Sequence, residues 1–283
     1  CGIIGRVLSF THRAYVATEA GKNVYFVRHG TAVHNVRYRQ KDVVFKDLID
    51  KRSRTDADRE NRLLYPEIEE WAFMTDETID TELVEAGVLE ARALGEAWAK
   101  GEAFLYDRKG KTEQRMPLAM GDIDLIVTSP LTRTLQTTSN IFFQMELLGS
   151  GDMLKPQWRP VGEEGIPMVA LETVKEWSQG RHTPNQRKPR SDLALLYPYV
   201  NFSLLETEID VMWQKSWPDT EDGLEPRLHL ESRVAEFRRW LLERPEQNIV
   251  VVSHGTFLGN LLFGTFIEET VGVAHCKIYA TRI

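Results

Sequence analysis

Three short apolar runs in this chain end abruptly in residues that can carry chemistry. The first covers 23–28 and leads into His29, and the last covers 248–253 and leads into His254. Apolar runs of this length are typical of strands that are buried on both faces of a parallel sheet. Open α/β sheets bind ligands in the crevice outside the carboxyl ends of such strands. We therefore expect the two histidines to share one site.

The third run, 123–128, adds an arginine to this expected site. It breaks at Ser129-Pro130 and passes into a helix start that contains Arg133, while Arg28 closes the first run. Guanidinium groups and the free N–H groups of a helix N-terminus match the oxygens of phosphate. Two arginines and two histidines at one sheet edge therefore predict an anion site, with phosphate as the first candidate.

Helical periodicity separates the apolar runs. We expect helices over 82–100, 131–148, 228–243 and 256–263. In the first of these, apolar and small residues recur at helical spacing and form a stripe that faces the core: Leu83, Gly87, Ala91, Leu94 and Trp98. Strands and helices that alternate along the chain predict a three-layer α/β/α sandwich with a mostly parallel central sheet. A chain of 283 residues commonly forms one such domain, and we expect a single domain over 1–283.

These motifs resemble the signature of the histidine phosphatase superfamily, which includes the phosphoglycerate mutases. Its Arg-His-Gly strand end matches 28–30, and the asparagine that follows matches Asn35. Its second arginine segment matches 129–134, and its second histidine segment matches 252–255. The segment 83–95 looks like the family's first long helix, and two later segments are similar to a eukaryotic phosphoglycerate-mutase-like subgroup: 169–187 and 197–213. The resemblance runs from about Asn23 to the C-terminus.

The resemblance implies a metal-independent phosphatase that works through a phosphohistidine. His29 would attack phosphorus as a neutral imidazole. The phosphate ligands would be Arg28, Asn35, Arg133 and His254. The positive charge of the arginines and of His254 would take the place of a metal, and no cofactor is expected. A carboxylic acid must protonate the leaving group. Glu176 aligns with the family's acid, and Glu172 is the alternative because the register to Gly180 is open.

The segment 180–190, which follows the expected acid, is rich in cations and is expected to select the substrate. Its candidate substrate-binding residues are Arg181, His182 and Arg187. The plainer interpretation is a basic surface loop, which applies to Arg181, Lys188 and Arg190.

Two departures from the family pattern bear on the reaction. The subgroup usually has Cys-Asp where this chain has Asn185-Gln186, and many mutases have an acidic residue at the place of Thr31. Both departures favour a phosphatase over a phosphoglycerate mutase. A phosphate-binding or regulatory module without turnover is a third possibility, although such a module has no need of the acid.

A segment of mixed charge, at about 37–80, interrupts the alternation after the first strand. It includes Lys51-Arg52-Ser53-Arg54 and the charged stretch 56–60. The resemblance implies an insertion that covers the active-site mouth, as a lid would. For its most charged part we favour a solvated and partly mobile loop.

The net charge and the number of cysteines limit which binding partners and which cellular location we expect. The net charge is −7, with 42 acidic against 35 basic residues, which argues against a nucleic-acid surface and fits a small phosphorylated substrate held in a locally positive pocket. No apolar stretch approaches the roughly 20 residues of a membrane span. The two cysteines, Cys1 and Cys276, form no disulfide framework, so we expect a reducing, cytoplasmic location. The chain begins with cysteine, so we expect an upstream segment to be missing. Nothing in the pattern indicates an oligomeric state.

Overall fold

The computed structural model describes residues 21–53, 55, 65–143, 165–177, 180–214, 217, 220, 224–265 and 272–283. A seven-stranded sheet in the order β3-β2-β7-β1-β6-β4-β5 forms its centre. The strands are β1 (Asn23–Arg28), β2 (Phe104–Tyr106), β3 (Thr112–Arg115), β4 (Leu125–Thr128), β5 (Met168–Ala170), β6 (Asn248–Ser253) and β7 (Ile278–Arg282). The runs 23–28 and 248–253 form strands with the predicted bounds.

The strands that carry the expected site are parallel neighbours. β1 pairs with β6, β6 with β4, and β4 with β5, all in parallel. Antiparallel pairing occurs where β7 lies beside β1 and where β3 lies beside β2. The sheet is therefore mostly parallel, as predicted, and the carboxyl ends of β1, β4 and β6 meet at one edge.

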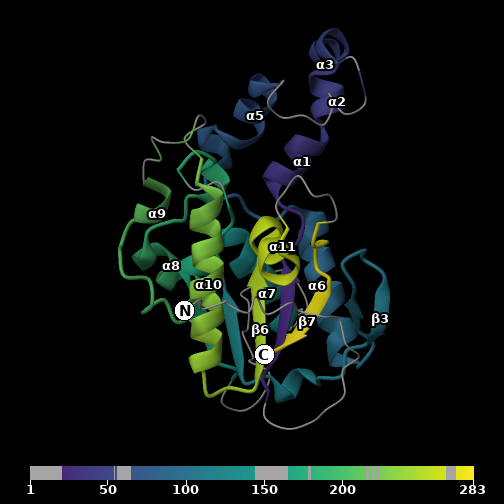
Figure 1. The fold of residues 1–283 in the computed structure, drawn as a ribbon, viewed down its shortest axis with the longest axis vertical. Helices are drawn as coiled ribbons and strands as arrows, with labels where there is room; N and C mark the ends of the chain where they lie inside the picture. Colours follow the sequence, from purple (N-terminus) through teal and green to yellow (C-terminus); the bar gives the residue numbers. More distant parts are fainter. Residues whose placement is uncertain are drawn as a thin grey trace, which may run out of the picture.

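Helices cover both faces of the sheet, and strand residues alternate between them. Tyr25 and Val27 belong to the core shared with α6 (Glu85–Ala99) and α7 (Thr132–Phe142). Val24 and Phe26 belong to the opposite core, shared with α10 (Arg227–Glu243) and α11 (Gly255–Phe263). Figure 1 shows α10 and α11 on the near side of the sheet. The expected three-layer α/β/α sandwich is confirmed.

Two of the predicted helices differ from the observed ones by more than one residue at an end, and the other two by one residue. The helix expected over 82–100 begins at Glu85, because Leu83 forms a bridge with Ala32 and the chain is still extended there. The helix expected over 131–148 ends at Phe142, since the backbone of Phe143 is extended and its ring packs on Tyr199. Residues 144–148 lie outside the described part.

The described part of the insertion at 37–80 is largely helical. It contains the end of α1 (Val33–Arg39), α2 (Lys41–Val44), α3 (Lys46–Arg52), α5 (Pro66–Phe73) and the 3-10 helix η2 (Asp76–Thr78). A small core of Ile49, Tyr65 and Ile68 joins these helices. Figure 1 shows them beyond the carboxyl edge of the sheet. Arg54 and the charged stretch 56–60 lie outside the described residues, and a role as a lid stays a prediction.

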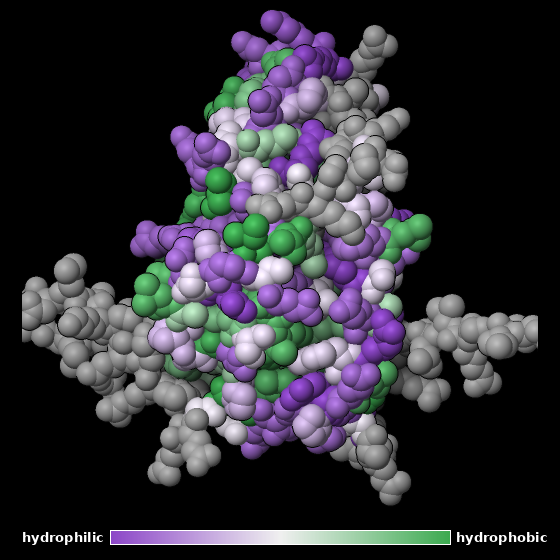
Figure 2. All heavy atoms as spheres, turned by 90° about the vertical axis from the view of Figure 1, so that its left-hand side faces the viewer, coloured by the Kyte–Doolittle hydropathy of each residue, from purple (hydrophilic) through white to green (hydrophobic). Residues whose placement is uncertain are grey.

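Short elements complete the described chain. They are η3 (Met120–Asp122), η4 (Glu172–Val174), η5 (Thr183–Asn185), α8 (Arg190–Leu196) and α9 (Val211–Gln214). Figure 2 shows polar and apolar side chains interspersed over one face of the molecule, with mainly hydrophilic ones at its projecting tip. None of the described helices has both the length and the apolar character that crossing a membrane requires.

Two glycines let α6 approach the loop after β1. A Cβ on Gly87 would lie 2.1 Å from the carbonyl oxygen of Thr31, and a Cβ on Gly30 would lie 2.5 Å from the carbonyl oxygen of Gly87. Real Cβ atoms do not approach backbone so closely, so either side chain would push α6 away from the loop that follows His29.

We predict that Gly87→Ala destabilises the protein by about 1–3 kcal/mol through this overpacking. Urea unfolding monitored by circular dichroism measures the change. Gly121→Ala is the matched control, because its Cβ would meet nothing within 4 Å. Equal unfolding midpoints for the two variants would contradict the close contact.

Candidate active site

His29 lies directly after β1 and is buried. Its Nδ1 lies 2.7 Å from the carbonyl oxygen of Gly30, and a carbonyl only accepts, so Nδ1 carries the proton. Its Nε2 is then unprotonated and carries a lone pair, which accepts a hydrogen bond from Arg133 Nε at 3.3 Å. Burial, and then the charge of Arg133, lower the pKa of His29 well below its ordinary value. The imidazole is therefore neutral, with an unprotonated nitrogen beside a guanidinium.

Arg28 and His254 add two unsatisfied nitrogens to this centre. Arg28 Nη1 donates to the carbonyl of Val273 at 2.8 Å, and the His254 ring lies 5.1 Å from the His29 ring. Arg28 Nε and His254 Nδ1 are both buried without a partner in the part of the chain that the structure describes. Buried polar atoms normally have partners, because leaving them unpaired costs free energy. A bound ligand would satisfy both nitrogens.

Arg133 is held rigidly in the first turn of α7. Besides the contact with His29, its Nη1 donates to the carbonyl of Pro184 at 2.5 Å and its Nη2 to Asn185 Oδ1 at 2.9 Å. Asn185, where the chain departs from the family pattern, donates in turn to the carbonyl of Trp177. Burial lowers the pKa of Arg133 to about 10, so the guanidinium remains charged at neutral pH. Its partners here are neutral oxygens and an imidazole.

Asp80 holds the beginning of α7 and was not predicted. Its carboxylate accepts from the backbone N–H and the hydroxyl of Thr132, each at 2.7 Å. Lys188 Nζ lies 3.3 Å from the same carboxylate. Asp80 therefore fixes the turn that carries Arg133, and it does so across 52 residues of sequence. No local pattern could have revealed that contact.

Asn35 follows the site loop in the first turn of α1. Its Oδ1 accepts from the backbone N–H of Ala32 at 3.0 Å. This bond fixes the orientation of the amide, so that the Nδ2 group is the donor that remains for a ligand.

The two candidate acids have different surroundings. Glu176 Oε1 accepts from the backbone N–H groups of Thr256 at 3.1 Å and Phe257 at 3.2 Å, so Glu176 caps α11. It is also the carboxylate that interacts most strongly with the charges of Arg28 and Arg133. Glu172 instead accepts from Arg187 Nε. The structure therefore brings Glu176, and not Glu172, to the arginines of the site.

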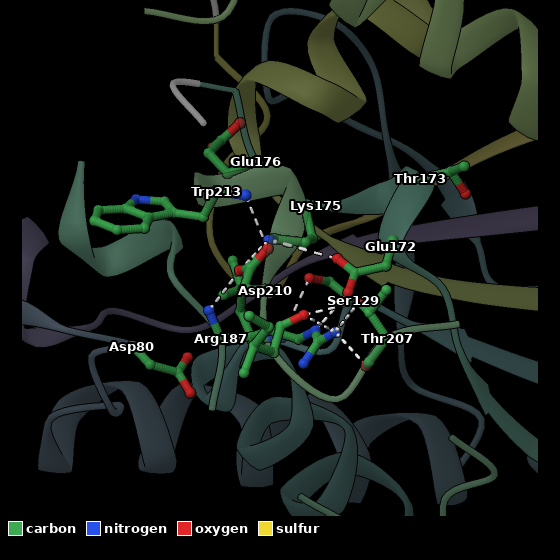
Figure 3. A network of polar contacts seen from close by, with 12 residues as sticks. Asp80, Ser129, Glu172, Thr173, Lys175, Glu176, Arg187, Thr207, Asp210 and Trp213 are labelled. Atoms are coloured by element: carbon green, nitrogen blue, oxygen red, sulfur yellow. Dashed lines mark hydrogen bonds and ion pairs between the residues drawn. The ribbon is translucent and has the colours of Figure 1, made fainter. Parts of the chain in front are cut away.

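Arg187 belongs to a buried charge network with Glu172 and Asp210. Its Nη groups donate to the carbonyls of Thr207, Glu208 and Ile209 at 2.9–3.1 Å, besides the bond to Glu172. Lys175 pairs with Asp210 in the same network, whereas the Glu176 side chain extends away from it (Figure 3). The guanidinium of Arg187 is fully occupied by protein oxygens. Its predicted role in substrate binding stays a prediction that this placement does not favour.

The other cations of 180–190 also have partners. His182 Nε2 lies 2.7 Å from Glu69 Oε1, and Arg181 lies 4.0 Å from the same carboxylate. Lys188 pairs with Asp80 and Arg190 with Glu208. Thr183 donates to the carbonyls of Phe73 and Thr75, so this segment fastens the insertion to the body of the protein.

Two further histidines lie beside His29 and were missed. The ring of His275 is 5.3 Å from that of His29, and the ring of His34 is 6.1 Å away. His34 falls inside the motif between Thr31 and Asn35, which was the available signal, whereas His275 comes from the distant segment before β7. Within the described residues, no group of three or more His, Cys, Asp or Glu could hold a metal ion.

The four histidines make stability depend on pH. Burial, as the largest cause, lowers the pKa of His29, His34 and His254 well below the ordinary value, and that of His275 to about 3. Below about pH 6.5 the unfolded chain therefore binds more protons than the folded one. As the pH falls further, each of these histidines lowers the free energy of unfolding by up to about 1.4 kcal/mol per pH unit.

We predict that the free energy of unfolding, measured by urea titration, decreases as the pH is lowered from 6.5 to 5. His275→Asn should make this fall shallower, since asparagine can still donate to the carbonyl of His29 but does not titrate. A flat profile in the wild type would contradict the burial of neutral imidazoles.

Comparison with known proteins gives sequence relatives but no matching family model. Phosphoglycerate mutase-like protein 1 of Arabidopsis thaliana is 26% identical over 250 residues, which cover 85% of this chain and 71% of that protein. A phosphoglycerate mutase-like protein of the same plant is 29% identical over 152 residues, which cover 50% of this chain and 54% of that protein. The chain thus spans about half the length of the latter relative.

Among solved structures, the α-ribazole phosphatase of Shigella flexneri superposes with a TM-score of 0.44 at 16% identity. The superposition covers 91% of this chain and 89% of that one. The sequence relatives show that this chain is similar to phosphoglycerate mutase-like proteins, the resemblance that its Arg-His-Gly, Arg133 and His254 motifs indicated.

Proposed function

We propose that this protein is a phosphatase that hydrolyses a phosphomonoester through a phosphohistidine on His29. The observation that carries the proposal is the His29 ring itself. Its Nδ1 donates to Gly30 and its neutral Nε2 faces the guanidinium of Arg133. A lone pair held in this way is prepared to attack an electrophile that carries negative charge.

In the first step, the Nε2 lone pair of His29 forms a bond to phosphorus as the bond from phosphorus to the leaving oxygen breaks. The leaving oxygen takes a proton from the carboxylic acid form of Glu176, which becomes a carboxylate. In the second step, Glu176 accepts a proton from water, and the oxygen of that water displaces His29 from phosphorus. Inorganic phosphate leaves, and both side chains return to their starting states.

Charge stabilisation in this proposal comes from the protein alone. The transferred phosphoryl group spreads negative charge over three oxygens in the transition state. Arg28 Nε, His254 Nδ1 and the amide of Asn35 have donor capacity to spare, and Arg133 adds positive charge. Fixed donors of this kind account for large rate enhancements in dry sites. The mechanism therefore needs no metal.

The substrate class is a small phosphorylated molecule. The sequence relatives carry the name of phosphoglycerate mutase-like proteins, and a mutase would use the same phosphohistidine. Thr31 and the Asn185-Gln186 pair favour hydrolysis over return of the phosphoryl group to substrate. The remaining candidate is a phosphate-binding module without turnover.

We predict that hydrolysis of para-nitrophenyl phosphate by the wild type survives excess EDTA. His29→Ala should lose at least about 10³-fold in kcat/KM, because the nucleophile is removed. Quenched reactions with labelled substrate should give an acid-labile phosphoryl group on the wild type and none on the variant. Unfolding curves of both proteins show whether the variant still folds.

Activity that vanishes with EDTA would overturn the metal-free mechanism, and activity retained in His29→Ala would overturn the nucleophile. A wild type that exchanges phosphoryl groups between phosphoglycerates, with little hydrolysis, would indicate the mutase. Phosphate binding without either reaction would indicate the binding module.

For the acid, we predict that Glu176→Gln slows hydrolysis of alkyl phosphates by about 10²–10⁴-fold. The loss on para-nitrophenyl phosphate should be much smaller, because nitrophenolate leaves without a proton. Glutamine keeps an oxygen that can accept from the N–H groups of α11. Glu172→Gln is the matched control and should show no such dependence on the leaving group. Equal losses on both substrates in Glu176→Gln would favour Glu172 or a structural role.

A further inference from the structure

His34 lies against the proposed phosphate site without having a role in it so far. It is on α1, one residue before Asn35, and only 8% of its surface is exposed. Its ring centroid is 6.1 Å from that of His29 and 6.1 Å from that of Phe73. The electrostatic neighbours of His34 are Arg133, Arg28, His275 and His182, and His254 interacts with it in turn.

The hydrogen bond between His34 and Thr81 decides which ring nitrogen carries the proton. His34 Nδ1 and Thr81 Oγ1 lie 2.6 Å apart, and Thr81 is buried. If Nδ1 donated, the hydroxyl proton of Thr81 would have no acceptor among the described residues. If Thr81 donates, its proton is satisfied and Nε2 of the neutral ring carries the hydrogen. Satisfaction of the buried hydroxyl therefore selects the Nε2–H form.

The Nε2–H group of His34 has no acceptor within the described parts of the chain. The charges that act most strongly on this ring are the guanidinium groups of Arg133 and Arg28, so the acceptor that fits there is an anion. Burial and the neighbouring arginines hold the pKa of His34 well below its ordinary value, and the ring is neutral. A neutral imidazole can still polarise a bound oxygen by donating a hydrogen bond to it.

We propose that His34 binds the phosphoryl group of the substrate through Nε2–H, and that Thr81 holds it in the donating tautomer. The inference rests on the proposed function for the identity of the anion. It adds a ligand from the motif 31–35 to those already assigned. Thr81 acts through His34 and is a positioning residue.

The test is calorimetric titration of the protein with inorganic phosphate, because binding can be measured whether or not turnover occurs. Two pairs of variants are compared. His34→Leu removes the donor, whereas His34→Gln keeps an N–H group at a similar distance from the backbone. Thr81→Val removes the hydroxyl with little change of shape, whereas Thr81→Ser keeps it.

We expect His34→Leu to weaken phosphate binding by about 10-fold or more, as loss of a hydrogen bond to a charged group would. His34→Gln should stay within about threefold of the wild type. Thr81→Val should bind more weakly than Thr81→Ser. The kcat/KM for para-nitrophenyl phosphate should follow the same order, and unfolding midpoints should not.

Wild-type affinity in His34→Leu would overturn the inference, and so would equal losses in His34→Leu and His34→Gln, which would indicate a packing role. If His34→Leu does not fold, the Thr81 pair decides, and equal affinity in its two members would overturn the inference. None of these outcomes touches the proposed function, which fails only if the wild type neither binds phosphate nor hydrolyses its esters.

Discussion

Burial of positive charge is the constraint on which this site depends. Arg28 and Arg133 lose their water as the carboxyl ends of the strands are covered, and burial lowers the pKa of both. The same loss of water keeps the neighbouring imidazoles neutral. A centre that is positive but unprotonated at its histidines can attract a phosphate dianion and still offer it a nucleophile.

The fold supplies the means to hold this unfavourable arrangement. Parallel pairing of β1 with β6 and of β6 with β4 places His29, His254 and Ser129 at one edge. Asp80 then fixes the first turn of α7, and Glu176 occupies the N-terminus of α11. Both carboxylates lie close enough to offset part of the charge of the arginines.

Sequence patterns were sufficient to predict those features that are local in sequence or that follow directly from parallel strand pairing. The strands 23–28 and 248–253 were predicted with their bounds, because continuous apolar runs were bounded by polar residues. The convergence of His29, Arg133 and His254 followed from the shared edge. The start of α6 was misplaced because Leu83 is drawn into a bridge with Ala32, a contact between distant segments.

The partners of individual cationic side chains could not be predicted, because they depend on which carboxylates and carbonyl oxygens the fold places beside them. Arg187 pairs with Glu172 and His182 with Glu69, and the role in substrate binding expected for both stays a prediction. Asp80 and His275 come to the site from segments that are distant in sequence, and no local sequence pattern indicates their roles.

The two roles assigned to Glu176 affect how homologues should be compared. The side chain to which the proposed mechanism assigns proton transfer is also the cap of α11. A descendant that had lost catalysis would still be under selection to keep this glutamate, because losing it would loosen a core helix. Retention of the glutamate is therefore a poor marker of activity in the family tree, and the histidine at the end of β1 is the position to inspect when inactive members are sought.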